Sequence, residues 1–215
     1  MKLDNYQLQF ITHCNERYSY IDSARIALEG GCRWIQLRMK DADEMSLEQT
    51  ARIVREMCSE VNATFIIDDN VPMARKVGAD GVHLGKNDMP IAEARKLLGN
   101  EYIIGGTVNT FADIESMHRS GAVDYLGCGP FRFTSTKKNL SPVLGIAGYR
   151  SVVAMMREAG ISIPIVGIGG ICKEDVRQLL EVGVDGIALS SSVLCADDPV
   201  EEMRRIVAIV NEFSE

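Results

Sequence analysis

The chain has 215 residues, 46% of them hydrophobic and 25% charged, enough to bury the core of a single domain spanning residues 1–215. The formal net charge of -7 argues against nucleic acid as a partner, because a phosphate backbone needs a basic face. No apolar run approaches the roughly 18 residues that cross a bilayer, and the N-terminus lacks the features of a signal peptide. We therefore expect a soluble, cytoplasmic protein with no membrane partner, and leave a homo-oligomer open.

Strand-like apolar runs alternate with amphipathic helical patterns from one end of the chain to the other. The predicted strands are LQFIT (8–12), WIQLRM (34–39), TFIID (64–68), GVHLG (81–85), YIIGG (102–106), DYLGC (124–128), PIVGI (164–168) and GIALS (186–190). The predicted helices occupy 20–29, 46–60, 70–77, 90–98, 110–119, 145–159, 173–181 and 199–213. This strict alternation predicts an α/β fold of parallel βα units, a (β/α)8 TIM barrel. A doubly wound open sheet is the alternative, but Cys172 replaces the third glycine of a dinucleotide fingerprint at GIGG.

An internal repeat supports the barrel. GADGVHLG (78–85) and GVDGIALS (183–190) share one pattern, and GAVDYLG (121–127) is a looser copy. In each, a glycine is placed to end a helix in the left-handed conformation before a buried strand begins. The six scattered cysteines form no CxxC pair, so we expect mostly core thiols and no disulfide framework.

Polar residues interrupt the second predicted strand. Gln36, Arg38 and Lys40 alternate with apolar residues, and if the apolar set faces the helices, these three line the barrel interior towards its mouth. Cations placed there are costly unless an anion meets them, which predicts a polyanion site. A salt-bridged plug inside the barrel is the alternative.

Carboxylates follow the next two predicted strands. Asp68 and Asp69 end the third strand and Asp88 follows the fourth. Neighbouring strands lie about 4.8 Å apart, so Asp69 and Asp88 are placed to share one hard cation, with Mg²⁺ the usual partner of carboxylates and phosphate oxygens. Alternatively, Asp88 caps the helix that starts near Pro90, and Asp69 or Asn70 caps the helix before it.

The last two strands are followed by turns that suit a phosphate. Three glycines lie at or just after the end of strand seven and three serines at or just after the end of strand eight, namely Gly167, Gly169, Gly170, Ser190, Ser191 and Ser192. Loops at these positions form the recurring phosphate site of such barrels through backbone N–H groups. A plain turn with serine capping is the alternative.

A long polar loop, GPFRFTSTKKNLSP (129–142), follows strand six. The whole connection to the next predicted helix, residues 129–144, has 16 residues, a length uncommon for loops that are not lids or binding elements. Thr134, Thr136 and Lys137 offer hydroxyls and a cation to an anionic substrate, although a solvated loop remains the alternative. His83, without metal-ligand spacing, is expected to be a packed or hydrogen-bonded core residue.

With these motifs placed, the chain resembles the thiamine phosphate synthase family over nearly its whole length. The resemblance rests on QLRMK, IIDDNV, GVHLGKND, GPFRFTSTKK, PIVGIGGI and the serine-rich turn before DDP, in the family's order. It implies a Mg²⁺-dependent transferase that joins 4-amino-2-methyl-5-hydroxymethylpyrimidine diphosphate to 4-methyl-5-(2-phosphoethyl)thiazole, or to its carboxylated form. Thiamine phosphate and pyrophosphate would be the products.

The resemblance also implies roles for individual residues. Gln36, Arg38, Lys40 and Lys137 would hold the diphosphate, Asp69 and Asp88 would bind Mg²⁺, Thr107 would lie near the leaving group, and Thr134, Thr136, Gly169, Ser190 and Ser191 would receive the thiazole phosphate. Arg38, Lys40, Lys137 and Thr107 are thereby the expected catalytic residues. Asp68, expected to contact substrate, stands where the family commonly has Asn, Lys86 replaces a frequent Gln and adds a cation near Asp88, and FRF (131–133) replaces an apolar-Tyr-Pro run.

Two other functions are weighed against the synthase. A thiazole tautomerase shares the fold but has no diphosphate or Mg²⁺ to hold, and a non-catalytic phosphate-sensing barrel needs only the last two loops. The combination of the Gln36, Arg38 and Lys40 line with Asp69 and Asp88 favours the synthase.

Overall fold

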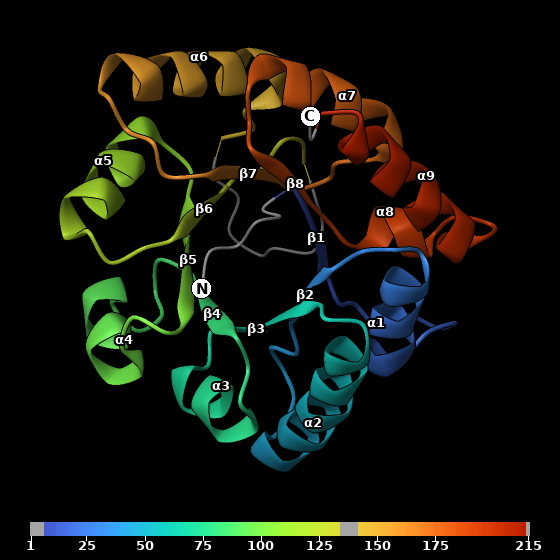
Figure 1. Cartoon of the computed structure of the whole chain (residues 1–215). Helices are drawn as coiled ribbons and strands as arrows, with labels where there is room; N and C mark the ends of the chain where they lie inside the picture. The colour runs from blue at the N-terminus through green and yellow to red at the C-terminus, as the bar shows by residue number, and fades with distance from the viewer. Residues whose placement is uncertain (1–6, 134–141, 214–215) are drawn as a thin grey trace.

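The computed structural model describes residues 7–133 and 142–213, and these residues form a closed barrel of parallel strands. The strands pair in chain order and β8 closes onto β1, with a ring of helices outside (Figure 1). They are β1 (Leu8–Ile11), β2 (Trp34–Leu37), β3 (Thr64–Asp68), β4 (Gly81–Leu84), β5 (Ile103–Val108), β6 (Tyr125–Cys128), β7 (Ile165–Ile168) and β8 (Gly186–Leu189). The predicted (β/α)8 barrel is confirmed, and the open sheet is wrong.

The helices follow the predicted ranges within two residues at either end. They are α1 (Tyr20–Glu29), α2 (Glu44–Glu60), α3 (Val71–Val77), α4 (Ile91–Leu98), α5 (Phe111–Ser120), α6 (Gly145–Glu158), α7 (Lys173–Val182), α8 (Ser191–Leu194) and α9 (Pro199–Asn211). The sequence did not predict α8, because four residues are too few to show a helical period. Within the described part of the chain, none of these helices is long and apolar enough to cross a membrane.

Two apolar layers hold the barrel together. One lies between strands and helices and includes Ile35 and Leu37, the outward residues of β2. The other fills the barrel interior and includes Trp34, whose ring meets the Tyr125 ring edge-on at 4.8 Å between centroids. The side-chain alternation predicted for β2 is therefore observed.

The repeated pattern of a glycine followed by an aspartate two or, in the looser copy, three positions later has a structural explanation. Gly78, Gly121 and Gly183 have φ of 65°, 60° and 99°, the left-handed conformation that ends a helix without steric cost to glycine. The aspartates that follow are Asp80, Asp124 and Asp185, and each accepts a 2.7 Å hydrogen bond from a backbone N–H of the preceding strand. The repeat thus fixes where β4, β6 and β8 start relative to β3, β5 and β7.

All six cysteines are free thiols, as expected. Cys32, Cys58 and Cys128 are buried, Cys172 is half-buried, and Cys14 and Cys195 are exposed. The expectation that most of them are core residues therefore holds for only three.

Candidate active site

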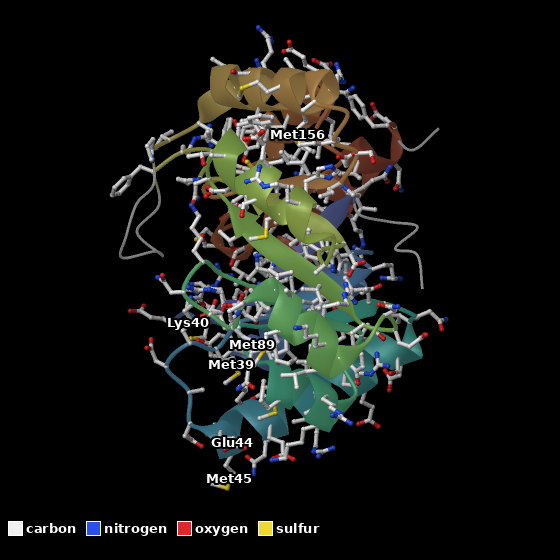
Figure 2. The ribbon with its side chains drawn as sticks, turned by 90° about the vertical axis from the view of Figure 1, so that its left-hand side faces the viewer. Met39, Lys40, Glu44, Met45, Met89 and Met156 are labelled. Carbon is white, nitrogen blue, oxygen red and sulfur yellow. The ribbon has the colours of Figure 1, made fainter. Side chains whose placement is uncertain are left out.

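The polar line of β2 reaches the carboxyl end of the barrel, but the strand is shorter than predicted. β2 ends at Leu37, so Arg38 and Lys40 lie in the loop that follows it, and only Gln36 lies inside the barrel at 2% exposure. The Arg38 side chain is 23% exposed and the Lys40 side chain 47% exposed. Figure 2 shows Lys40 reaching solvent at the same end of the barrel as Met89, which follows Asp88. Arg38 and Lys40 therefore lie at the open mouth of the barrel and do not plug its interior.

Asp68 binds two residues of this line. Nε2 of Gln36 donates to Oδ1 of Asp68 at 2.6 Å, and Nε of Arg38 lies 3.4 Å from Oδ2 of Asp68. Because an ionised carboxylate only accepts hydrogen bonds, Asp68 fixes the Gln36 amide with its nitrogen towards β3. Oε1 of Gln36 is buried and has no hydrogen-bond partner in the described part of the chain. The site therefore offers a buried acceptor at this position.

Asp69 and Asp88 come together at the mouth, as the spacing predicted. Asp69 has φ of 62°, a left-handed conformation that aspartate tolerates better than most residues, and its Oδ2 lies 3.0 Å from Nζ of Lys40. Oδ2 of Asp88 accepts a 2.7 Å hydrogen bond from the backbone N–H of Gly85. A Cβ at position 85 would lie 2.7 Å from that oxygen, so a side chain there would displace the Asp88 carboxylate from this hydrogen bond.

The capping alternative is correct for only one of the two helices. Oδ1 of Asn70 accepts from the backbone N–H of Met73 and caps α3. Asp88 does not cap α4, because the N-cap residue of that helix is Pro90 and no side chain caps it. Asp88 is thus free of that structural role.

The two carboxyl groups lie close enough for each to shift the pKa of the other. Burial raises the pKa of Asp88, and the Asp69 carboxyl raises it further. Burial also opposes ionisation of Asp69, but the hydrogen bond from Asp88 and the ammonium of Lys40 outweigh it and lower the pKa of Asp69. Two carboxylates held this close repel each other when both are ionised, and a divalent cation would relieve that repulsion.

The carboxylates of Asp69 and Asp88 suit Mg²⁺ better than they suit a metal ion whose ligands all come from the protein. No group of three or more His, Cys, Asp or Glu side chains that could hold a metal occurs within residues 7–133 and 142–213. Mg²⁺ commonly binds through one or two carboxylates and completes its shell with water and substrate phosphates. Asp69 and Asp88 match that pattern.

A chain of hydrogen bonds crosses the barrel interior and ends at Thr107. Gln9 donates to the hydroxyl of Tyr125 at 3.2 Å, and that hydroxyl lies 3.0 Å from Nδ1 of His83. Nε2 of His83 lies 3.0 Å from Oγ1 of Thr107, near the carboxyl end of β5. His83 is thus the hydrogen-bonded core residue that we expected, and it fixes the hydroxyl of Thr107.

Sequence reasoning missed Gln9 and Tyr125, although a signal was present. The inward-facing residue before Thr107 is Gly105, and a Cβ there would lie 2.2 Å from the Tyr125 ring and 2.5 Å from Nδ1 of His83. Glycine inside a strand marks close approach by another group. Here the group is the tyrosine–histidine pair.

The turn after β7 begins later than the glycine pattern suggested. Gly169 and Gly170 have φ of 98° and 69°, which only glycine adopts readily, and they form the turn. Gly167 lies within β7, and a Cβ there would meet Tyr149 and Ile171 at 3.5 Å. Gly167 therefore lies outside the turn for which it was predicted, and its surroundings would accept a Cβ at ordinary van der Waals distance.

The serines after β8 lead into a short helix, α8, that has no side-chain cap. Ser190 precedes α8 and makes no side-chain cap, so the serine-capping alternative is not observed. Ser191 begins α8, and Oγ of Ser192 is buried with no partner among the described residues. The backbone of Ser190 and Ser191 is thus at the carboxyl end of β8, beside β7 in the sheet.

The loop after β6 is described only at its two ends. Thr134, Thr136 and Lys137 lie outside the described residues, so their predicted roles remain predictions. The stem residues pair across the loop, since the N–H of Leu144 donates to the carbonyl of Pro130 and the N–H of Gly145 to that of Phe131, both at 2.9 Å.

Lys86 does not place its charge on Asp88. Its Nζ lies 2.7 Å from Oδ2 of Asp113, a carboxylate that also accepts from the backbone N–H groups at the start of α5. The expected extra cation beside Asp88 is therefore neutralised by α5.

Comparison with known proteins agrees with this geometry. A family model for thiamine monophosphate synthase matches residues 8–193. The thiamine-phosphate synthases of Phocaeicola vulgatus and Bacteroides fragilis are 59% and 60% identical over 201 and 202 residues, covering 94% of this chain and 96% and 98% of theirs. The solved thiamine phosphate pyrophosphorylase from Pyrococcus furiosus has a TM-score of 0.86 and 36% identity, covering 99% of both chains. The chain belongs to the thiamine monophosphate synthase family.

Proposed function

We propose that the protein is a thiamine phosphate synthase, a transferase that joins the pyrimidine diphosphate to the thiazole phosphate. The observation that carries this proposal is the meeting of two cations, Arg38 and Lys40, with the carboxyl pair of Asp69 and Asp88 at one barrel mouth. Cations alone would bind an anion, and carboxylates alone would bind a metal. Both together suit a metal diphosphate.

The diphosphate would be held from two sides. Arg38 and Lys40 provide guanidinium and ammonium donors, with Lys137 a third cation outside the described residues. Asp69 and Asp88 would hold Mg²⁺, which when bound supplies positive charge to the diphosphate oxygens. Thr107, with its hydroxyl fixed by His83, would donate to or accept from the leaving group.

Gln36 and Asp68 would orient the pyrimidine. Asp68 accepts from one of the two N–H donors of Gln36, and the buried amide oxygen has no partner among the described residues, so Gln36 offers that oxygen to a ligand as an acceptor. An amide oxygen repels phosphate and accepts from an amine, which favours contact with the 4-amino group over the contact with diphosphate that the resemblance implied. Asp68 would thus bind substrate indirectly, by fixing Gln36 and Arg38.

The thiazole phosphate would bind at the last two turns. The backbone of Gly169 at the β7 turn and of Ser190 and Ser191 at the β8 turn offers N–H groups on adjacent strands. Thr134 and Thr136 would add hydroxyls from the preceding loop.

The reaction depends on aligning the two substrates and on stabilising charge on the leaving group, and it needs no nucleophilic side chain. The C–O bond between the pyrimidine methylene and the diphosphate breaks, and its electron pair leaves with pyrophosphate. The thiazole nitrogen gives its lone pair to that carbon and forms the C–N bond of thiamine phosphate. Charge that develops on the leaving group is stabilised by the cations, and the two anion sites align the reacting atoms.

Each of the two rival functions would leave some of the charged residues of this site unused. A tautomerase has no diphosphate for Arg38 and Lys40, and a phosphate sensor does not need the carboxyl pair. We also propose that the enzyme works in the cytoplasm, a setting that its six free thiols support.

The direct test is synthesis by the purified protein. We expect thiamine phosphate and pyrophosphate in equal amounts when both substrates are supplied, and neither product when the thiazole phosphate or the pyrimidine diphosphate is omitted. Thiazole phosphate binding without any product would instead support the tautomerase or the sensor.

A further inference from the structure

Arg132, in the FRF segment that departs from the family pattern, makes more contacts than an ordinary surface arginine. Its Nη1 and Nη2 lie 2.6 and 2.8 Å from the two carboxylate oxygens of Asp175, a fork-to-fork ion pair. Nη1 also donates to the carbonyl of Gly170 at 2.8 Å, and the guanidinium lies 4.7 Å from the centre of the Phe131 ring. One side chain thus joins the loop after β6 to the turn after β7 and to the first turn of α7.

Arg132 completes a row of hydrogen bonds to three successive carbonyls. The N–H of Phe131 donates to the carbonyl of Ile168 at 2.8 Å, and the N–H of Arg132 to that of Gly169 at 3.0 Å. The third carbonyl, of Gly170, is bound by the Arg132 side chain. In a trans peptide the C=O and N–H groups point in opposite directions, so the N–H that follows each carbonyl points away from residues 131–132.

The turn is shaped to let Arg132 approach. A Cβ on Gly170 would lie 2.6 Å from Cγ of Arg132, so the arginine packs directly on the glycine backbone. Gly169 and Gly170, with positive φ, have no side chain to stiffen the turn by packing. The orientation of the peptide between Gly170 and Ile171 therefore depends on the guanidinium.

Arg132 also neutralises a carboxylate beside this turn. The Asp175 side chain is 13% exposed, and its Oδ2 accepts from the backbone N–H of Cys172 at 2.9 Å. Without a cation, this half-buried charge would repel a phosphate that binds to the turn. Arg132 supplies the cation and has few donors left for a ligand.

We propose that Arg132 is a positioning residue for the acceptor phosphate: it orients the N–H groups of residues 169–171 and neutralises Asp175. This inference rests on the proposed function, in which that turn receives the thiazole phosphate. Arg132 itself touches no substrate. Its loss should therefore weaken one substrate and leave the other unaffected.

The test compares Arg132→Met with Arg177→Met. Methionine keeps much of the length and packing of arginine but removes its charge and donors. Arg177 is a matched control on the same helix as Asp175, because its Nη2 likewise pairs with a carboxylate, that of Glu212 at 2.5 Å, and its guanidinium lies 5.6 Å from the Phe213 ring centre. Steady-state kinetics would give kcat and both KM values, and calorimetry would give the Kd of the thiazole phosphate.

We expect Arg132→Met to raise the KM and Kd of the thiazole phosphate about tenfold. The KM of the pyrimidine diphosphate and kcat should stay within about twofold, as should every constant of Arg177→Met. Adding Asp175→Asn to Arg132→Met should recover part of the affinity, because the uncompensated charge is removed. Unchanged thiazole phosphate affinity, or equal weakening of both substrates, would overturn the proposal.

A second variant and a binding measurement separate failure of the proposal for Arg132 from failure of the proposed function. If Arg132→Met does not fold, Arg132→Lys keeps the charge but loses the fork, and it should give a smaller selective loss of thiazole phosphate affinity. If the wild-type protein makes no thiamine phosphate, the proposed function fails, and calorimetry still decides the role of Arg132. Absence of thiazole phosphate binding to the wild type would overturn both.

Discussion

Nζ of Lys40 lies 3.0 Å from Oδ2 of Asp69, so a cation proposed to hold the diphosphate is paired with a carboxylate proposed to hold Mg²⁺. Arg38 is likewise paired, with Asp68. Both cations of the mouth thus have a carboxylate partner before any ligand binds, which lowers the cost of holding the two cations together. Mg²⁺ bound to Asp69 would compete with Lys40 and free its ammonium for the diphosphate.

Asp69→Asn should damage the metal site more than the fold. We expect kcat/KM to fall by about 100-fold and the Mg²⁺ concentration for half-maximal rate to rise, because a neutral amide binds Mg²⁺ weakly. Glu44→Gln is the control, since Glu44, labelled in Figure 2, is a 77% exposed carboxylate at the start of α2 that pairs with Lys76. A Mg²⁺ titration of both variants measures the effect, and an unchanged Mg²⁺ requirement in Asp69→Asn would count against the site.

Arg38→Gln should reduce both activity and stability. The Asp68 side chain is 8% exposed, so losing its guanidinium partner leaves a buried charge and should lower the free energy of unfolding by about 1–3 kcal/mol. Adding Asp68→Asn should restore the stability but not the activity. Urea unfolding and steady-state kinetics of the three variants separate these effects, and recovery of activity in the double variant would show that Arg38 serves only Asp68.

Tyr125→Phe should destabilise the barrel interior. Its hydroxyl joins Gln9 to His83, and both are buried, so removing it takes one hydrogen bond from each of two buried polar side chains. We expect a loss of about 1–3 kcal/mol in the free energy of unfolding. Tyr102→Phe removes a hydroxyl outside this chain of contacts and should change stability by less than about 0.5 kcal/mol. Equal effects in the two variants would mean that the interior chain contributes nothing.

The Arg132–Asp175 pair should give a pH-dependent contribution to stability. Burial alone would raise the pKa of Asp175, but hydrogen bonds from Arg132 and Cys172 outweigh burial and lower the pKa below its usual value. A lowered native pKa contributes stability above the unfolded pKa, and that stability is lost as pH falls through the native pKa. The wild type should therefore exceed Arg132→Met in stability near neutral pH by up to about 1 kcal/mol, and the difference should shrink on acidification.

Urea unfolding of the wild type, Arg132→Met and Arg177→Met, from neutral pH down through the pKa of Asp175, measures that difference in the free energy of unfolding. A gap between wild type and Arg132→Met that widens as pH falls would show that the pair is not the source.

The fold could be predicted because each βα unit carries local signals. Apolar runs, helix periods and the glycines of the repeat lie within a few residues of one another, and the positive φ of Gly78 and Gly183 is what the repeat implied. The meeting of Asp69 and Asp88 was also predictable, since carboxyl ends of neighbouring parallel strands share an edge.

The rest depends on contacts between residues far apart in the chain. Arg132 and Asp175 are separated by 43 positions, and Gln9 and Tyr125 by 116, so no local spacing reveals either pair. The end of β2 at Leu37 was misjudged because alternation of side chains continues into the loop. The partner of Lys86 was also missed because it is distant in the chain: Asp113 lies 27 positions away, on α5.

Binding of the pyrimidine diphosphate with and without Mg²⁺ tests most directly whether the cations and the carboxyl pair form one metal-diphosphate site. Calorimetry should show wild-type affinity at least about tenfold tighter with Mg²⁺, and little effect of Mg²⁺ on Asp69→Asn. Equal wild-type affinity in the two conditions would contradict the account, because Asp69 and Asp88 would then have no part in holding the diphosphate.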